Sequence, residues 1–90
     1  MTTRVLGEVV KKPYKLAPGY ADKEYLRLLI DISPIRSNKV IKALHEYFVF
    51  GETRAKVCEK HDVNQGYLSI KIKELNLLNE RIAKLLPYYV

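Results

Sequence analysis

The sequence predicts an all-α protein, a small helical domain of about five helices with a central helix-turn-helix. Apolar residues recur at spacings of three and four along most of the chain, which is the period of a helix. Ser, Thr and Asn, residue types that cap helix N-termini, stand just before several of these runs. No segment alternates apolar and polar residues well enough to indicate a strand. Ninety residues, 48% of them hydrophobic, provide for one core in one domain.

Residues 1–20 are expected to form a basic, flexible N-terminal arm. Glycine and proline recur there, and only the piece at 5–10 has an extended character. The arm could contact phosphates or the minor groove of DNA, or it could be a loose tail that aids solubility. Residues 21–90 would then form the helical, DNA-binding domain.

The first helix is expected to begin at Ala21 or Asp22. It should end before 33–34, Ser-Pro, because the residue ahead of a proline resists helical geometry. Its apolar stripe comprises Tyr25, Leu26, Leu29 and Ile30.

A second helix is expected to follow Ser37, its cap, and to end at Phe48 or Phe50, ahead of Gly51. Its apolar residues again recur at helical spacing, so one face should be buried. That face comprises Val40, Ile41, Leu44, Tyr47 and Phe48.

Residues 53–75 have the pattern of a helix-turn-helix. Thr53 is a suitable cap for its first helix, a turn is expected at 61–63, and Asn64 is a suitable cap for the second helix. The apolar side of the first helix comprises Ala55, Val57, Cys58 and the stem of His61. The inward stripe of the second helix comprises Leu68, Ile72 and Leu75. In this motif the second helix enters the major groove of DNA with its N-terminal residues nearest the bases.

The apolar pattern continues beyond Leu75, through Leu78, Ile82 and Leu85, until Pro87 stops it. The second helix of the motif could run on to about residue 86, or break near 76–79 with Asn79 capping a fifth helix. We favour the break. The apolar surface of this segment could form a dimer interface together with the first helix, or it could simply close the small core.

The net charge of +6 is concentrated in two segments. Residues 1–20 and 53–73 each carry a net charge of +3, whereas 21–52 and 74–90 are each balanced. This distribution favours a polyanionic partner, although a few lysines can also cluster by chance. There is no membrane span or export signal, so we expect a cytoplasmic, nucleoid-associated protein.

Enzyme, cofactor and metal functions have little support in the sequence. Cys58 is the only cysteine, and Cys58 with His61 would supply only two metal ligands. No orienting third group or oxyanion donor can be identified for a Cys/His nucleophilic pair. We therefore expect no catalytic residue, no cofactor, no metal and no small-molecule substrate, and interpret Cys58 as a small packing residue.

The candidate DNA-contacting side chains lie on both helices of the motif. On the second helix, Asn64 and Gln65 can pair with adenine, Lys71 and Lys73 can hold phosphates, and Tyr67 can reach a phosphate or a thymine methyl. Ser69 is small enough to let the helix sit deep in the groove. This helix has no arginine facing the groove, so the commonest guanine contact is missing and A/T-rich or weakly specific sites are favoured.

On the first helix of the motif, Arg54 is the main candidate for a contact with the DNA backbone. Its alternative is an exposed ion pair with Glu52 or Glu59, which would contribute little. Lys56 and Lys60 are further candidates for the same role.

Several motifs together resemble the PapB-like regulators of fimbrial adhesin operons in enterobacteria. They are Val-Cys-Glu-Lys at 57–60, Asn-Gln-Gly-Tyr at 64–67 and Leu-Leu-Pro-Tyr-Tyr at 85–89, and the resemblance extends over roughly 24–89. It implies a sequence-selective, oligomerising transcription regulator that binds A/T-rich DNA near fimbrial promoters as an activator or repressor. It also implies that DNA binding depends on Arg54 and Cys58, and that binding is sensitive to the minor groove.

The function expected is therefore a transcription regulator of a fimbrial operon. It would bind A/T-rich double-stranded DNA as a homodimer that oligomerises further. The alternative is a helical protein-interaction module that docks on a recombinase or polymerase subunit through the stripe at Leu78, Ile82 and Leu85.

Overall fold

The computed structural model describes residues 16–89, which form four α-helices and a final 3₁₀ turn, with no strand in this part of the chain. The predicted all-α class is confirmed. The elements are α2 (Lys23–Ile32), α3 (Asn38–Phe48), α4 (Arg54–His61), α5 (Gln65–Leu85) and η1 (Leu86–Tyr88). Most of the predicted arm, including its extended piece at 5–10, lies outside the described residues.

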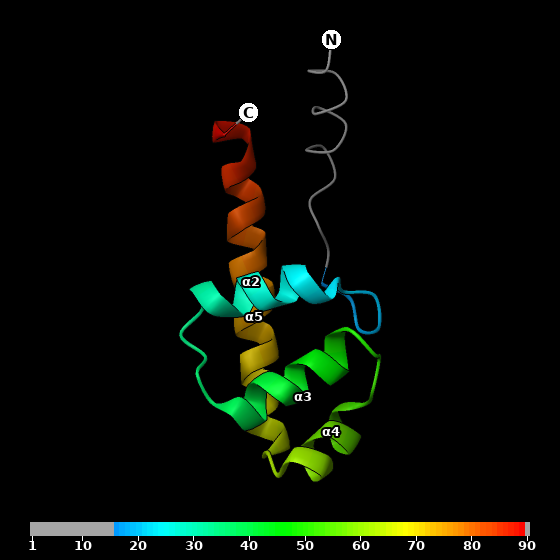
Figure 1. Cartoon of the computed structure of the whole chain (residues 1–90). Coiled ribbons are helices and arrows are strands. Elements are labelled where there is room, and N and C mark those ends of the chain that lie inside the picture. Colours follow the sequence, from blue (N-terminus) through cyan, green and yellow to red (C-terminus); the bar gives the residue numbers. More distant parts are fainter. Residues whose placement is uncertain (1–15, 90) are drawn as a thin grey trace.

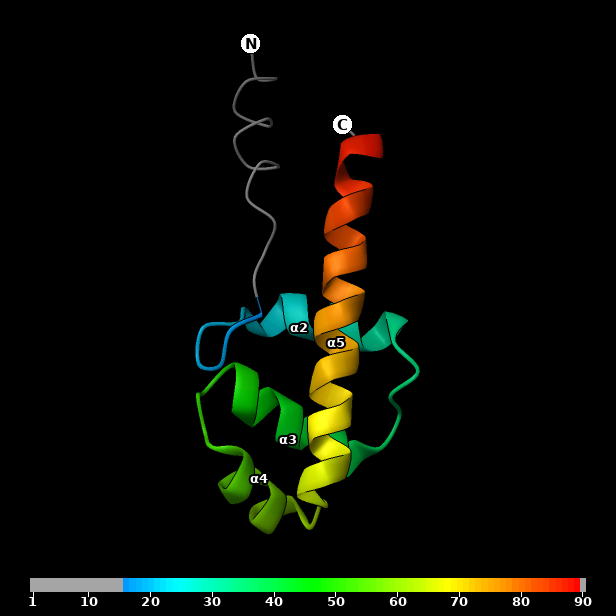
Figure 2. The same ribbon diagram turned by 180° about the vertical axis from the view of Figure 1, so that it is seen from behind.

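The long helix α5 is the axis of the molecule (Figures 1 and 2). Helices α2 and α3 lie across it, and α4 lies beside its N-terminal end. The C-terminal part of α5 projects beyond the other helices. This arrangement places the predicted helix-turn-helix at one end of the molecule and the apolar tail of α5 at the other.

Helix α3 begins after its predicted cap, Ser37, and α2 begins directly after Asp22, one of its two predicted start positions. The Asp22 side chain accepts a hydrogen bond from the Tyr25 backbone N–H at 2.9 Å, and the Ser37 hydroxyl accepts one from the Val40 N–H at 3.5 Å. Each bond satisfies a donor that the first helical turn leaves without a partner.

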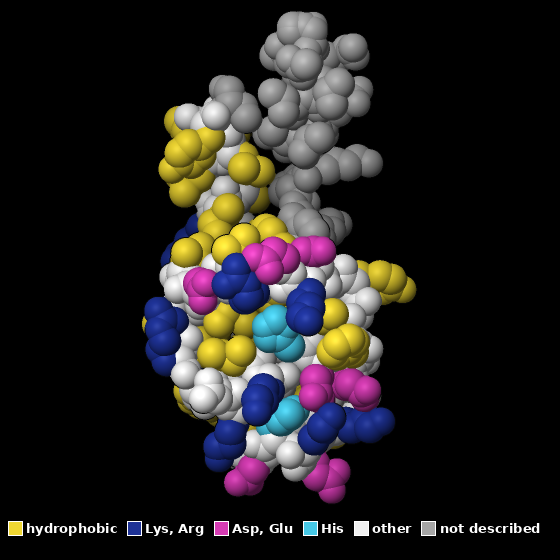
Figure 3. Space-filling view, viewed as in Figure 1, with side chains coloured by type: hydrophobic (Ala, Val, Ile, Leu, Met, Phe, Trp, Pro, Cys, Tyr) yellow, Lys and Arg dark blue, Asp and Glu magenta, His cyan; other side chains and the backbone are white. Residues whose placement is uncertain are grey.

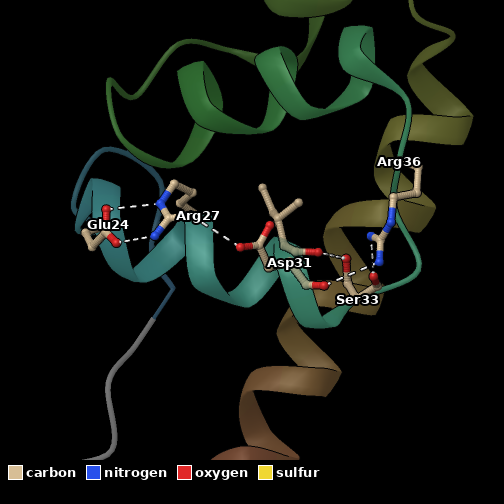
Figure 4. Close-up of polar contacts among 6 residues, drawn as sticks. Glu24, Arg27, Asp31, Ser33 and Arg36 are labelled. Atoms are coloured by element: carbon tan, nitrogen blue, oxygen red, sulfur yellow. Dashed lines mark hydrogen bonds and ion pairs between the residues drawn. The ribbon is translucent and has the colours of Figure 1, made fainter.

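The end of α2 is held by side chains that follow it (Figure 4). The Ser33 hydroxyl donates to the Ile30 carbonyl oxygen at 2.7 Å, and the Arg36 guanidinium donates to the Ser33 and Ile35 carbonyl oxygens at 2.6 and 2.7 Å. A cation at a helix C-terminus also complements the helix dipole. The proline at position 34 therefore follows an end that is already well capped.

The core lies between α5 and the three helices around it. The fourteen buried hydrophobic side chains of the described residues come from these helices and from the short segments before and between them. The expected stripes are buried at most positions, although Tyr25 of α2 and Ile41 and Tyr47 of α3 are only partly covered. Ala55 is exposed, so its predicted place on the apolar side of α4 is wrong. Residues two positions apart in a helix point in nearly opposite directions, so Ala55 faces away from the core in which Val57 is fully buried.

The predicted break near 76–79 is also wrong, because α5 continues through these residues to Leu85. Asn79 is 8% exposed and does not act as a cap. Its side-chain oxygen accepts a hydrogen bond from the Tyr25 hydroxyl of α2. The polar residue that suggested a new helix start instead forms a contact between two helices.

Residues 16–20, the last of the predicted arm, are packed against the end of α3. The backbone N–H groups of Gly19 and Ala21 both donate to the Phe48 carbonyl oxygen, at 2.9 and 3.0 Å. Gly19 and Gly51 both have positive φ, and a Cβ added to Gly51 would lie 3.2 Å from the Gly19 Cα. Two glycines are therefore needed for the backbones to approach this closely.

Candidate nucleic-acid interface

The turn between α4 and α5 is fixed by two caps and one left-handed residue. The Thr53 hydroxyl accepts from the Lys56 N–H at 3.1 Å, and Asn64 Oδ1 accepts from the Tyr67 N–H at 3.0 Å. Asp62 has φ of 56°, and the next residue, Val63, donates its N–H to the Cys58 carbonyl oxygen at 2.9 Å. These contacts set the direction in which α5 leaves α4. We call the two helices and this turn the α4–α5 pair.

The α4–α5 pair is anchored to the core by a few residues on each helix. Val57 and Cys58 are buried from α4, and Leu68, Ile72 and Leu75 are buried from α5. Burial raises the pKa of the Cys58 thiol, although the nearby Arg54 acts in the opposite direction. The thiol therefore stays protonated and unreactive near neutral pH, which agrees with a packing role.

The exposed face of α5 starts with polar side chains. Gln65 is exposed, Tyr67 is 47% exposed, and Lys73 is exposed two turns further on. Asn64 differs from Gln65 because its side-chain oxygen is already used as the helix cap. A bidentate contact with adenine needs both the oxygen and the amino group of the amide. Gln65 is therefore better suited to that contact than Asn64.

Arg54 connects the first turn of α4 to α5. Its guanidinium donates to the Ser69 hydroxyl at 3.4 Å, and it forms no ion pair with Glu52 or Glu59. Glu52 instead pairs with Lys56 at 3.3 Å. The contact places the Arg54 charge beside the exposed face of α5, as an anchor to a DNA backbone would require.

Three of the other predicted cations pair with carboxylates of the chain itself. Lys56 pairs with Glu52, Lys60 with Glu46 and Lys71 with Glu74, at 3.3, 3.2 and 3.2 Å. The Lys71 ammonium also lies 5.1 Å from the centre of the Tyr67 ring. Among the candidate cations, only Arg54 and Lys73 have no ion-pair partner in the described part of the chain.

The predicted site is therefore divided in two. Ser69, Arg54 and the start of α5 lie together, whereas Lys60 reaches Glu46 on α3 and Lys56 reaches the segment before α4. The basic charge that the sequence assigns to one segment thus lies on two sides of α4.

Glu46 and His61 form a junction that the sequence did not indicate. Glu46 Oε2 on α3 accepts from His61 Nε2 at 3.0 Å and from the Lys60 ammonium at 3.2 Å. Since a carboxylate only accepts, His61 Nε2 carries a proton in this contact. Burial raises the pKa of Glu46, but its hydrogen bonds with His61 and Lys60 outweigh burial and leave that pKa below its ordinary value. The junction holds the end of α4, and so the turn, against α3.

The face drawn in Figure 3 has no region of a single charge sign. Basic and acidic side chains alternate over α2, α3 and α4, while hydrophobic side chains gather on the projecting end of α5 and down to the edge of α2. Within residues 16–89, no three metal-ligating side chains come together, and no helix is long and apolar enough to cross a membrane.

The fold and the α4–α5 pair define a small all-α protein of the class that includes many DNA-binding regulators. The family model for PapB, the adhesin biosynthesis transcription regulatory protein, matches residues 2–89. The chain belongs to this family, whose members are transcription regulators and not enzymes.

Individual relatives agree with this assignment. The regulatory protein FanB of Escherichia coli is 55% identical over 69 residues, which cover 77% of this chain and 70% of FanB. The major pilus subunit operon regulatory protein PapB of the same species is 45% identical over 74 residues, covering 82% of this chain and 71% of PapB. The crystal structure of E. coli FocB has a TM-score of 0.77 and 38% identity, covering 98% of this chain and 99% of FocB.

Proposed function

We propose that the protein regulates a fimbrial or adhesin operon by binding A/T-rich double-stranded DNA through the α4–α5 pair. The observation that carries the proposal is the exposed start of α5, where Gln65 and Lys73 face solvent beside the Arg54 guanidinium. An amide beside unpaired cations suits adenine recognition combined with phosphate binding. The family match supports the regulatory role, and such a regulator would act in the cytoplasm on the nucleoid.

The candidate residues differ in what they contribute. Arg54 and Lys73 can bind phosphates without first breaking an ion pair, whereas Lys56, Lys60 and Lys71 must give up a carboxylate partner or share it. We therefore assign most of the salt-dependent affinity to the first two. Cys58 acts indirectly, because it packs inside the pair that presents Arg54.

Fluorescence anisotropy of labelled duplexes tests the proposal. The wild-type protein should bind an A/T-rich duplex more tightly than a G/C-rich duplex of equal length, and both affinities should fall as salt rises. Arg54→Ala should weaken both, while Lys84→Ala, at the far end of α5, should change neither. No affinity for either duplex at low salt would refute DNA binding.

We further propose that the protein forms a homodimer through α2 and the C-terminal part of α5. Leu28 and Ile32 of α2 are 50% and 62% exposed, and they border a groove of about 410 Å³ that Ile82 of α5 also lines. Leu85, Tyr88 and Tyr89 continue the exposed apolar surface along the tail of the chain. Such a surface lies at the opposite end of the molecule from α4 and the start of α5, so a dimer would leave the candidate DNA contacts of both protomers free.

Sedimentation velocity tests the dimer. Ile32→Glu should shift the protein toward monomer, whereas Phe50→Glu, which also replaces an exposed apolar side chain by a carboxylate but lies just after α3, should not. A wild-type monomer, both with and without DNA, would contradict the proposal.

The alternative function, docking on a recombinase or polymerase subunit through Leu78, Ile82 and Leu85, has less support. Leu78 and Ile82 are partly buried and pack against the core, so only Leu85 of the three is largely exposed.

A further inference from the structure

A hollow of about 300 Å³ lies between the start of α2 and the end of α3. It is lined by Lys23, Lys42, His45, Glu46, Val49 and Phe50. The face drawn in Figure 3 shows histidine, basic and hydrophobic side chains together over these two helices. None of the lining residues is a candidate DNA contact, and none belongs to the proposed dimer surface. The functions proposed above therefore leave this hollow without an occupant.

The apolar part of the hollow comes from the two residues that follow α3. Val49 is half-buried and packs against the core, whereas Phe50 is 69% exposed. An exposed aromatic ring beside a hollow offers a contact surface to another large apolar side chain. Single exposed rings are common, so the polar groups around Phe50 decide what this one can bind.

The lysines of the hollow carry positive charge that the chain does not compensate. Lys23 of α2 and Lys42 of α3 are exposed, and neither forms an ion pair within residues 16–89. The Glu46 carboxylate also lines the hollow, but it is held by His61 at 3.0 Å and by Lys60 at 3.2 Å. The hollow is therefore positive overall and attracts an anionic group.

His45 adds a hydrogen-bonding group to the same hollow. Its side chain is half-buried, and its ring forms no hydrogen bond in the part of the chain that the structure describes. Burial and the Lys23 ammonium both lower the pKa of His45, so its ring is uncharged at neutral pH and has one N–H donor. A carboxylate bound by the lysines can accept a hydrogen bond from this N–H.

The combination of charge and apolar surface identifies the class of ligand. The backbone of DNA offers phosphates but no large apolar group to cover Phe50. A protein segment can offer both, as an apolar side chain between acidic residues. We propose that the hollow docks an acidic segment of a partner protein, with one large apolar side chain on Phe50 and flanking carboxylates on Lys23 and Lys42. This inference does not depend on the proposed DNA binding, because the two sites share no residue.

Titration of the full-length protein with synthetic peptides, followed by two-dimensional amide NMR spectra, tests the proposal. The probe is the end-blocked peptide Asp-Asp-Phe-Asp-Asp, and its control is Asp-Asp-Ser-Asp-Asp. The first should shift the amide signals of Lys23, Lys42 and Phe50 saturably, and the second should bind about tenfold more weakly. A Lys23→Gln, Lys42→Gln double variant should bind the first peptide about fivefold more weakly. An Arg81→Gln, Lys84→Gln variant removes two exposed cations of α5 and should bind it like wild type.

The contrary outcomes each overturn the inference. No shift at peptide concentrations up to about 5 mM would exclude the docking site. Equal binding of the two peptides would show that the apolar surface contributes nothing. Shifts confined to α4 and the start of α5 would show only a general attraction of acidic peptides to the candidate DNA contacts. If the Lys23→Gln, Lys42→Gln variant instead loses more affinity for an A/T-rich duplex than the Arg81→Gln, Lys84→Gln variant, and binds the peptide as wild type does, the two lysines bind DNA.

Discussion

Replacing Glu46 by glutamine should destabilise the protein by loosening the α4–α5 pair from α3. The new side chain would keep the size of the old one and an acceptor oxygen, but it would lack the charge that attracts His61 and Lys60. The Glu46 side chain is 20% exposed and that of His61 is 15% exposed, so this contact is partly shielded from water. The Lys60 side chain is 64% exposed, so its contact is close to a surface ion pair.

These exposures set the expected size of the effect. A hydrogen bond to a charged group contributes about 1.5–3 kcal/mol when buried, and an exposed ion pair contributes about 0–1 kcal/mol. Because glutamine retains part of the hydrogen bonding, we expect Glu46→Gln to lower the free energy of unfolding by about 1 kcal/mol. For a domain of this size, that change lowers Tm by roughly 4–8 °C.

Thermal and urea unfolding followed by circular dichroism measure this destabilisation. The matched control is Glu59→Gln, which removes an exposed carboxylate of α4 and should change stability little. An equal destabilisation of the two variants at neutral pH would refute the reasoning.

The stability difference between wild type and Glu46→Gln should depend on pH. The pKa of Glu46 is lowered from its ordinary value of 4.5 in the folded protein. The ionised carboxylate is therefore favoured by folding, and its contribution is complete above pH 4.5 and lost as pH falls through the folded-state pKa. The stability difference between wild type and Glu46→Gln should shrink over that acidic range. A difference that stays constant would show that the charge is not its cause.

Three further predictions concern stability. Gly51→Ala should cost about 1–2 kcal/mol in urea unfolding, because the residue has φ of 75° and its new Cβ would crowd the Gly19 Cα. Tyr25→Phe removes the hydroxyl that donates to the buried Asn79 side chain, and should cost about 1–3 kcal/mol by the same assay; an unchanged stability would mean that water replaces the hydroxyl. Burial lowers the pKa of His45 below its ordinary value of 6.5, so wild-type stability should fall as pH drops from 6.5 through the folded-state pKa. His45→Gln should lack this part of the fall in a pH series of urea midpoints.

The sequence predicted the helix starts well because each is a local feature. Ser37, Thr53 and Asn64 all cap the helices expected of them, Asp22 caps the helix whose start was expected at Ala21 or Asp22, and each bond involves residues three positions apart. The inward stripe of α5 was predicted equally well. Its three residues are at helical spacing, and all three are buried.

The contacts between distant elements could not be predicted in this way. Asn79 was interpreted as a cap because asparagine favours that position, whereas its hydrogen bond comes from Tyr25, 54 residues away. The carboxylate partner of Lys60 is Glu46 on another helix, and nothing in the local pattern indicates it. The same limit applies to Arg54: the alternative to its expected DNA contact was an ion pair with a nearby glutamate, whereas its observed partner is Ser69 on α5. The sequence therefore predicts which segment forms the candidate site, but not which side chains lie together on its surface.

The salt dependence of DNA binding tests most directly whether the start of α5 binds the DNA backbone. The affinity of wild type, of an Arg54→Ala, Lys73→Ala double variant and of Lys84→Ala is measured on one A/T-rich duplex between about 50 and 200 mM salt. Removing one cation that binds a phosphate should reduce the slope of log affinity against log salt by about one. The slope of the double variant should therefore be smaller by about two, and that of Lys84→Ala should equal the wild-type slope. Three equal slopes would contradict the assignment of Arg54 and Lys73 as the phosphate-binding residues.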